Sequence, residues 1–405
     1  MKASQRFIPE DVEQLSAELN SELCNSLQVE PGATQRHVLF VIDQLVEYGG
    51  AERVLLNTIR WLPADRYRCS LLTFKLGEGF GGLQDVRCPL YVWPLVKTYD
   101  LRAVKTASRL LRFLRKENVA LVHTFFETSD LWAAPIAKLL GRVPVVSSRR
   151  DMGILRHRKH TIAYRFAGKL YDRVVTVSEQ VRKFCIAEDR LPSEKVTTLY
   201  NGIEVLDRED NRSGFPAEKP ASAPITVTTV AHVRRIKGID VLIDVAEQVR
   251  KLYPTVRFVV VGGAHEPEYF RSMQAIVENR GLEANVTFAG ECDSPADFLE
   301  DSDIFFLPSR SEGFSNALVE AMLHKLPCVA TKVGGNGEAI RDGVTGFLVP
   351  PDDVTSAADK ICTLIADRML RLEMGACARQ SALRKFTAHA MITGLTKIYD
   401  EVLHA

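Results

Sequence analysis

Residues 303–322 read DIFFLPSRSEGFSNALVEAM, a stretch typical of a strand, a turn and the start of a helix. The apolar run 304–307 leads into a polar bend, and apolar residues then recur at three- and four-residue spacing. Two carboxylates bracket the predicted helix start, Glu312 in the bend and Glu320 eight residues later. If the helix begins near Ser315, Glu320 lies ~7 Å further along its axis, at ~1.5 Å per residue.

The start of this helix is a candidate site for an anion. The unpaired N–H groups of a first helical turn point toward whatever occupies the carboxyl end of the preceding strand, and they favour negative charge there. A ligand with a phosphate at that point and hydroxyl groups on either side, such as a nucleotide sugar, would suit Glu312 for the sugar and Glu320 for the ribose. The alternative is that Glu312 caps the helix and Glu320 is a solvated helix residue.

The composition is that of an ordinary globular chain. Its 405 residues, 46% hydrophobic and 25% charged, are enough for two domains with cores of their own. A net charge of +1 gives no overall field that would attract nucleic acid or a membrane. The eight cysteines lack metal-ligand spacing and indicate free thiols in a reducing compartment. Without a signal peptide or a long apolar run, we expect a cytoplasmic protein.

Strands and helices alternate along the first half of the chain. After residues 1–35, which we interpret as an appended helix, short β-branched runs alternate with helical patterns as far as residue 203. We expect strands at 37–43, 69–74, 90–93, 119–124, 143–148, 173–178 and 196–199, with helices up to about 61, at 101–117 and near 129–140. This alternation is typical of a parallel, doubly wound sheet.

A second alternation follows a charged linker rich in proline and glycine. We expect strands at 225–231, 256–261, 285–288, 304–307 and 327–331, with helices at 238–252, 267–280, 315–324 and within 354–383. The predicted fold class is α/β, with two Rossmann-like doubly wound parallel-sheet domains facing across a cleft that would hold a ligand. The expected parts are an extension 1–35, a first domain 36–203, a linker 204–224, a second domain 225–386 and a final helix 387–405. This helix is expected to pack back on the first domain, and packing on the second domain is the alternative.

Paired glycines, Gly49 and Gly50, stand where the first helix of the first domain begins. Backbone without side chains can come close to a ligand and leaves N–H groups for a phosphate or hydroxyl. A plain strand-to-helix loop is the alternative. Gly77, Gly79 and Gly82 match the dinucleotide-binding pattern G-x-G-x-x-G, but no clear helix follows, so we expect no dinucleotide there.

From about residue 37 to 403 the chain resembles the retaining glycosyltransferases of family 4, whose two Rossmann-like domains form the GT-B fold. Four landmarks in a specific order carry the resemblance: Gly49 with Gly50, the basic turn RRIKG at 234–238, the run VVGG at 260–263, and Glu312 with Glu320 in an E-x7-E arrangement. Glycine turns at 334–335 and 343–349 follow where that family has them.

The resemblance implies that the second domain binds a UDP- or GDP-linked sugar. Lys237 would contact the diphosphate. Many relatives also have an arginine five residues before this lysine, where this chain has His232, and Arg234 is the nearest residue that could replace that arginine. Glu320 would contact the ribose and Glu312 the transferred sugar. The loops 263–266 and 290–294 would surround the base of the nucleotide, with Gly263 near it. The other implied contacts with the nucleotide sugar are the backbone at Phe314, Ser315 and Asn316, and Gly50 from the first domain.

His123 is the remaining catalytic candidate. Relatives often carry His-x-His at the end of the fourth strand, whereas here only His123 aligns and Phe125 replaces the second histidine. The resemblance implies a role near the sugar or acceptor, and a buried structural histidine is the alternative. Glu127 or Asp130 could assist the acceptor.

The implied reaction transfers a hexose or N-acetylhexosamine to a glycan or lipid-linked glycan with retention of configuration. The acceptor hydroxyl would attack from the side that the diphosphate leaves, and a phosphate oxygen would take its proton. No covalent nucleophile, cofactor or metal is then expected, and no nucleic acid partner. Two alternatives are a nucleotide-sugar epimerase of GT-B shape and a non-catalytic sugar-nucleotide binding module.

Residues 101–117 predict a basic amphipathic helix, and a second basic cluster follows between 149 and 159. Surface of this kind can rest on anionic lipid, so peripheral contact with the inner face of a membrane is a further expectation. The alternative is a helix that packs on its sheet with a solvated basic face.

Overall fold

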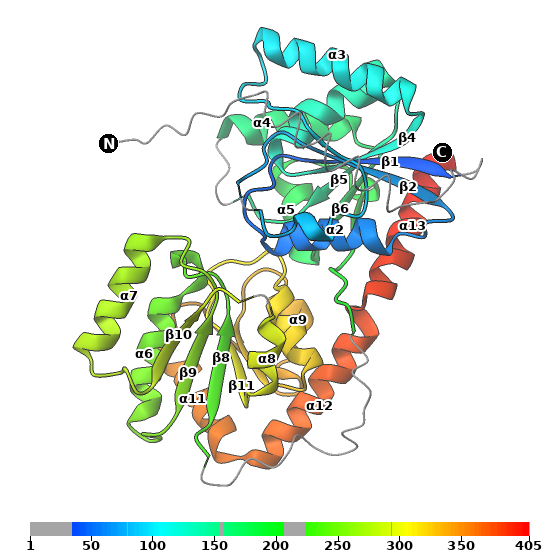
Figure 1. The fold of residues 1–405 in the computed structure, drawn as a ribbon. Coiled ribbons are helices and arrows are strands. Elements are labelled where there is room, and N and C mark those ends of the chain that lie inside the picture. The colour runs from blue at the N-terminus through cyan, green and yellow to red at the C-terminus, as the bar shows by residue number, and fades with distance from the viewer. Residues whose placement is uncertain (1–34, 79, 154–157, 206–222, 293, 405) are drawn as a thin grey trace. The chain divides into compact units, whose positions relative to one another are not determined.

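A computed structural model of the chain describes residues 35–78, 80–153, 158–205, 223–292 and 294–404, which form two compact units (Figure 1). The first unit takes the described residues up to Leu199, and the chain returns to it from Met391. The second unit is Tyr200–Ala390. These divisions lie a few residues from the expected domain boundaries at 203 and 386. The predicted N-terminal helix and most of the predicted linker lie outside the described residues.

The first unit is built on a seven-stranded sheet in which every paired strand is parallel, in the order β3-β2-β1-β4-β5-β6-β7. Its strands are β1 Arg36–Ile42, β2 Tyr67–Thr73, β3 Leu90–Val92, β4 Val119–Phe125, β5 Val145–Arg149, β6 Arg173–Thr176 and β7 Val196–Thr198. Its α-helices include α2 Gly50–Trp61, α3 Leu101–Lys116, α4 Arg158–Ala167 and α5 Glu179–Glu188. The interior strand β1 is buried from Val38 onward because helices cover both faces of such a sheet.

The second unit has a six-stranded parallel sheet in the order β10-β9-β8-β11-β12-β13. Its strands are β8 Thr226–Val230, β9 Arg257–Val261, β10 Val286–Gly290, β11 Ile304–Leu307, β12 Cys328–Thr331 and β13 Gly346–Val349. Its helices are α6 Ile239–Arg250, α7 Pro267–Asn279, α8 Pro295–Glu300, α9 Asn316–Leu323, α10 Asn336–Ala339, α11 Val354–Ala366 and α12 Arg368–Lys385.

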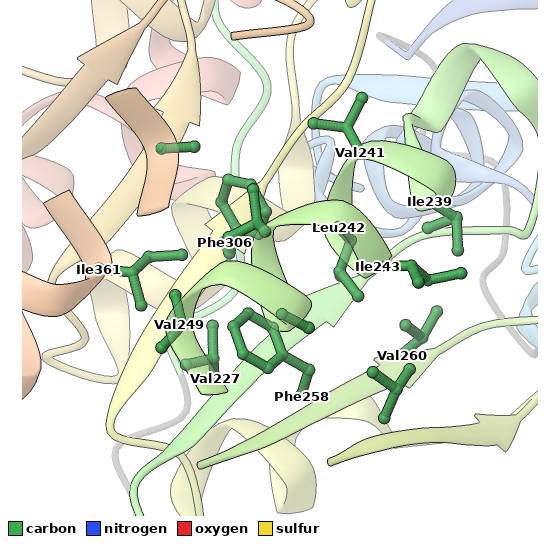
Figure 2. Close-up of a cluster of buried hydrophobic side chains, with 14 of the residues drawn as sticks. Val227, Ile239, Val241, Leu242, Ile243, Val249, Phe258, Val260, Phe306 and Ile361 are labelled. Atoms are coloured by element: carbon green, nitrogen blue, oxygen red, sulfur yellow. The ribbon is translucent and has the colours of Figure 1, made fainter. Parts of the chain in front are cut away.

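The core of the second unit lies between α6 and the middle of this sheet (Figure 2). Leu242 and Ile243 of α6 are fully buried against strand residues that include Phe258 of β9 and Phe306 of β11. Ile361 of α11 completes the layer. Burying one such side chain contributes roughly 1.5–3 kcal/mol, so this core fixes the strands whose carboxyl ends carry the site.

The final helix, α13 Ala388–His404, packs on the first unit over most of its length (Figure 1). Its Leu395, Ile398 and Tyr399 join the apolar cluster of β1, β2 and β4. Asp400 adds an ion pair with Arg66 at 2.7 Å on the surface beside them. Segments from the start and from the end of the described chain therefore pack together in the core of the first unit.

The two parallel sheets confirm the predicted fold of two Rossmann-like doubly wound domains. The predicted helix 129–140 instead consists largely of the π-helical turns Ser129–Ala133 and Ile136–Gly141. The helical segment 354–383 is interrupted at Asp367, whose side chain accepts a hydrogen bond from Leu370 N and caps α12. No helix within the described ranges is long and apolar enough to cross a membrane.

Candidate functional site

The topology of the second unit marks one place for a ligand. The chain runs from β8 outward through β9 and β10, then returns to the other side of β8 for β11. Connections after β8 and β11 therefore diverge, and ligands of doubly wound sheets bind at the carboxyl ends of such a strand pair. Lys237 follows β8 and Glu312 follows β11, and here their side chains meet, with 2.7 Å between Lys237 Nζ and Glu312 Oε1.

Two hydrogen-bond donors hold the largely buried side chain of Glu312. Its side chain is 8% exposed, and Oε1 accepts hydrogen bonds from Lys237 Nζ and from Ser309 Oγ, each at 2.7 Å. The Lys237 side chain is 25% exposed, so the cation lies at the edge of the site. Sequence reasoning predicted both residues as donor contacts but missed that they form an ion pair.

Two glycines allow the loops around this pair to touch at the backbone. Gly238, at the start of α6, has φ +66°, and a Cβ there would lie 2.2 Å from Pro308 O. Gly334, after β12, has φ +49°, and a Cβ would lie 1.7 Å from Glu312 O. Any other residue would be strained at these φ values and would collide with the neighbouring loop. The glycines thus let the loops after β8, β11 and β12 converge on Glu312.

Arg310 joins the loop after β11 to the start of α6 and to the turn after β13, and it was not predicted. Its guanidinium donates to both carboxylate oxygens of Asp240, at 2.9 and 2.6 Å, and to Asp352 at 2.8 Å. Burial alone would raise the pKa of Asp240, but hydrogen bonds from Arg310 and Tyr269 bring that pKa below its usual value. Nothing in the spacing of the sequence pairs Arg310 with a residue 70 positions earlier.

The first turn of α9 has its side chains engaged within the unit. Ser315 caps the helix by accepting from Leu318 N at 3.3 Å, and Asn316 Oδ1 accepts from Asn201 Nδ2 at 2.7 Å. Phe314 is buried among aromatic rings, 5.4 Å from Tyr200 between ring centroids. The predicted contacts of this turn with a donor concern its backbone, and they stay a prediction. Glu320 lies half-buried in the second turn of α9.

Arg234 lies in the loop after β8 that also carries Lys237, and Gly263 lies after β9. Arg234 is half-buried, and its carbonyl accepts from Lys237 N at 2.9 Å, which closes the turn that presents the lysine. Gly263 O accepts from Val233 N at 2.9 Å, so the ends of β8 and β9 stay joined beyond the sheet. Their donor roles stay predictions.

Gly50 belongs to the first unit, where it is the first residue of α2. Gly49 is the N-cap with extended backbone, and a Cβ on it would lie 2.9 Å from Glu52 Oε2. Gly49 thus leaves room for the Glu52 carboxylate at the helix start. A donor contact by Gly50 stays a prediction.

His123 lies inside β4 and not at the carboxyl end of the strand. Its ring is buried, with hydrogen bonds between Nδ1 and Tyr399 Oη at 2.6 Å and between Nε2 and Ser148 Oγ at 2.9 Å. Burial, aided by the charge of Arg150, lowers the pKa of His123 to about 3, so the ring is neutral at physiological pH. This is the geometry of the structural alternative, and a catalytic role stays a prediction.

The two acidic residues named as acceptor candidates also have partners in the first unit. Asp130 is fully buried and pairs with Arg149 at 3.3 Å. Glu127 pairs with His160, with 2.6 Å between Oε1 and Nδ1. Both carboxylates after β4 thus form ion pairs within the first unit.

Solved structures share the whole two-unit fold. The structure of Anabaena HepE in complex with UDP and glucose matches with a TM-score of 0.76 and 22% identity over 89% of this chain and 99% of that one. A glycosyltransferase from Rickettsia africae matches with a TM-score of 0.79 and 19% identity over 91% and 99%. The fold is the two-domain GT-B fold of glycosyltransferases.

Family models match both halves of the chain. The model for glycosyl transferases group 1 covers residues 211–381, and that for glycosyltransferase family 4 covers residues 48–205. This chain belongs to the family 4 glycosyltransferases, as its motifs predicted. It is 28% identical to N-acetyl-alpha-D-glucosaminyl L-malate synthase of Bacillus anthracis, over 75% of this chain and 80% of that protein.

A second relative spans nearly the full length. It is the UDP-Gal:alpha-D-GlcNAc-diphosphoundecaprenol alpha-1,3-galactosyltransferase of Escherichia coli, 22% identical over 87% of this chain and 94% of that protein.

Proposed function

We propose that this glycosyltransferase moves a hexose or N-acetylhexosamine from a nucleotide-diphosphate sugar to a glycan or lipid-linked glycan, with retention of configuration and without a metal. The observation that carries the proposal is the Lys237–Glu312 pair at the switch point between β8 and β11. It offers a cation for a diphosphate and a carboxylate for sugar hydroxyls within one hydrogen bond of each other.

The donor is a UDP- or GDP-sugar in this proposal. Lys237 and Arg234 contact the diphosphate, where each charge-assisted hydrogen bond contributes roughly 1.5–3 kcal/mol. Glu320 accepts from the ribose, one to two helical turns beyond the start of α9. The names of the Anabaena complex and the E. coli relative, with UDP and UDP-Gal, favour UDP.

The departing diphosphate is the base in the proposed reaction. The acceptor hydroxyl attacks the anomeric carbon on the side that the diphosphate leaves, and a phosphate oxygen takes the hydroxyl proton. Lys237 and Arg234 stabilise the negative charge that develops on the leaving group, which is the task a metal performs in other transferases. No protein nucleophile is required.

The acceptor is a glycan or a lipid-linked glycan. The E. coli relative is named for a diphosphoundecaprenol-linked sugar, and a Staphylococcus aureus relative, 32% identical over 51% of this chain, for poly(ribitol-phosphate). Both acceptors are anionic. Anionic acceptors of this kind would favour a basic face on the protein that receives them.

The segment before and at the start of α3 supplies such a face in the first unit. Val96, Tyr99 and Leu101 are 90%, 84% and 88% exposed, and Lys97 and Arg102 are exposed among them. Farther along α3, Ala103, Leu110 and Leu114 are buried, so the helix packs on its sheet and also presents an exposed apolar and basic end. Aromatic and aliphatic side chains beside cations suit the surface of an anionic membrane.

Donor binding by calorimetry is the first test. Titrations with UDP, GDP, ADP and their common sugars should show selective binding to one nucleotide, reduced at least tenfold in Lys237→Ala and in Glu320→Ala. Lys251→Ala, an exposed lysine of the same unit, is the control and should bind normally. If the folded protein bound none of these nucleotides, the proposed function would be wrong.

Product analysis then separates the enzyme classes. Incubation with the donor and lipid-linked or free glycan acceptors should yield a new α-linked product from an α-linked donor, in the presence of EDTA. Conversion of the free nucleotide sugar to an epimer, or no conversion, would support one of the alternatives.

Sedimentation with liposomes tests the membrane surface. Binding to vesicles that contain anionic lipid at low salt should decrease in Leu101→Ser and at high salt. Leu252→Ser removes a 70% exposed leucine of the second unit and should have no effect. Equal sedimentation with and without anionic lipid would contradict membrane contact.

A further inference from the structure

The outer face of helix α3 carries positive charge only. Its 16 residues include six lysines and arginines and no acidic residue. Four exposed residues recur along the helix at spacings of four, three and four, and they are Leu101, Lys105, Ser108 and Arg112. Residues at this spacing share one side of a helix. They form a basic stripe on the side of α3 opposite the side that packs on the unit.

The same surface offers apolar contact area. The exposed side chains at the start of α3 continue along the helix with Val104, which is 63% exposed. The neighbouring turn Ile136–Gly141 packs against α3 and exposes Leu139 and Leu140. A partner that matches this surface needs carboxylates beside aliphatic side chains.

Residues 7–35 have that character. They include six acidic residues and no lysine or arginine. Asp11, Leu15, Glu18 and Glu22 recur at spacings of four, three and four, which is the spacing of the basic stripe on α3. In a helix, this acidic stripe would lie beside the leucines at positions 19 and 23. Because residues 1–34 lie outside the described part of the chain, their pattern comes from the sequence alone.

The described chain begins beside the end of α3. His37 of β1 has its Nδ1 2.9 Å from the carbonyl oxygen of Glu117, the residue directly after α3. Its ring centroid is 6.1 Å from that of Phe113 in the last turn of α3. Residues 28–34 span up to about 25 Å when extended, at ~3.6 Å per residue. Since α3 is ~24 Å long at ~1.5 Å per residue, the acidic segment can reach all of it.

We propose that the acidic segment, residues 10–30, docks on the outer face of α3 in its own chain. Carboxylates of the acidic stripe pair with cations of the basic stripe, and the leucines beside them cover the exposed apolar side chains. Exposed ion pairs are individually weak, but the connection holds the segment near α3 at an effective concentration on the order of millimolar. The docked segment covers the cations that an anionic membrane would contact. This competition with lipid rests on the membrane contact proposed above.

Zero-length cross-linking of the full chain tests the docking. A carbodiimide joins a carboxylate to a lysine only where the two groups are in contact. Mass spectrometry of the cross-linked monomer should find bonds from carboxylates of residues 10–30 to Lys105 or Lys116 of α3. It should find none to Lys251, an exposed lysine of the second unit. The yield should fall roughly fivefold or more at 1 M salt, because the Debye length is then ~3 Å, compared with ~10 Å at 0.1 M.

Charge reversal separates a specific contact from chance collision. Arg112→Glu combined with Arg115→Glu should lower the yield of cross-links to α3 roughly fivefold or more, as should Glu18→Lys combined with Glu22→Lys. A variant with all four substitutions should regain cross-links between the same positions, with the charges exchanged. Arg271→Glu reverses an exposed arginine of α7 in the second unit and should leave the yield unchanged.

Three results would overturn the docking. They are cross-links from the acidic segment to lysines scattered over both units, a yield that does not respond to salt, and cross-links to α3 that occur only in covalent dimers. The last result would mean that the segment of a second copy occupies the face.

Vesicles test the competition with lipid. Anionic vesicles should lower the cross-link yield, whereas neutral vesicles should not. An equal yield with both kinds of vesicle would overturn the competition and leave the docking intact. Donor binding plays no part in these measurements, so calorimetry reports separately on a failure of the proposed donor site.

Discussion

Replacing Gly334 with alanine should weaken both the second unit and its donor site. The φ of Gly334 is +49°, and the added Cβ would lie 1.7 Å from Glu312 O, far inside van der Waals contact. The loop after β12 or the loop after β11 must therefore move. Because Glu312 carries the ion pair with Lys237, that movement displaces the two side chains on which the proposed donor site depends.

The cost has two parts that a second glycine can separate. A non-glycine residue in the left-handed region costs roughly 1–2 kcal/mol. Forcing an extra carbon into a packed region costs roughly a further 1–3 kcal/mol. Gly343 has φ +73° with no atom within 4 Å of the added Cβ, so Gly343→Ala bears the first cost alone. The two variants should differ by roughly 1–3 kcal/mol in free energy of unfolding.

Urea unfolding and donor calorimetry measure the two consequences on the same samples. Gly334→Ala should unfold at lower urea than Gly343→Ala and should bind the donor at least tenfold more weakly than the unsubstituted protein. Gly343→Ala should bind the donor normally. Equal unfolding free energies for the two variants, with unchanged donor affinity in both, would refute the steric argument and the claim that Gly334 fixes Glu312.

Three other substitutions should change the free energy of unfolding, or its pH dependence, by different amounts. Phe306→Ala removes a fully buried ring from the core of the second unit and should cost roughly 3–5 kcal/mol of unfolding free energy in urea. Asp400→Asn breaks an ion pair with Arg66 in which the aspartate side chain is 37% exposed, so the same assay should show a loss below about 1 kcal/mol. His123 has a folded-state pKa of about 3 against 6.5 when unfolded, so between these values the unfolded state binds the extra proton and stability falls as pH decreases. Unfolding measured from about pH 7 to 4 should be less acid-sensitive in His123→Gln, by up to about 1.4 kcal/mol per pH unit. Burial raises the pKa of Asp43 to about 6, which opposes this trend equally in both proteins, so their difference isolates the histidine.

The sequence predicted the strands other than β13 well, because they are short apolar runs bounded by turn residues. The strand β13, Gly346–Val349, was missed because it lies in the stretch 343–349 that we interpreted as a glycine turn. The run 304–307 was predicted with the bounds that β11 has, since Pro308 ends it. The π-helical turns after β4 were not predictable, because their apolar spacing is also that of an ordinary α-helix. The break at Asp367 was missed although aspartate before a helix is a capping signal.

The residues of the candidate site could be predicted from the sequence, but the contacts between them could not. Motif spacing pointed to Lys237 and Glu312 separately, but their ion pair joins residues 75 positions apart and depends on the order of the strands. The surroundings of His123 depend on Tyr399, 276 residues later, in a helix for which sequence reasoning left packing on the first domain as one of two possibilities. A spacing pattern within one segment contains no information on such partners.

The return of α13 to the first unit sets an order for biosynthesis. A nascent chain that has reached residue 390 already contains every residue of the second unit, yet it lacks the helix that supplies Tyr399 to the core beside β1 and β4. The unit whose translation starts first is thus the last to be completed. Until α13 has been translated, the apolar surface that it covers stays open, and a chaperone acting during translation would meet that surface.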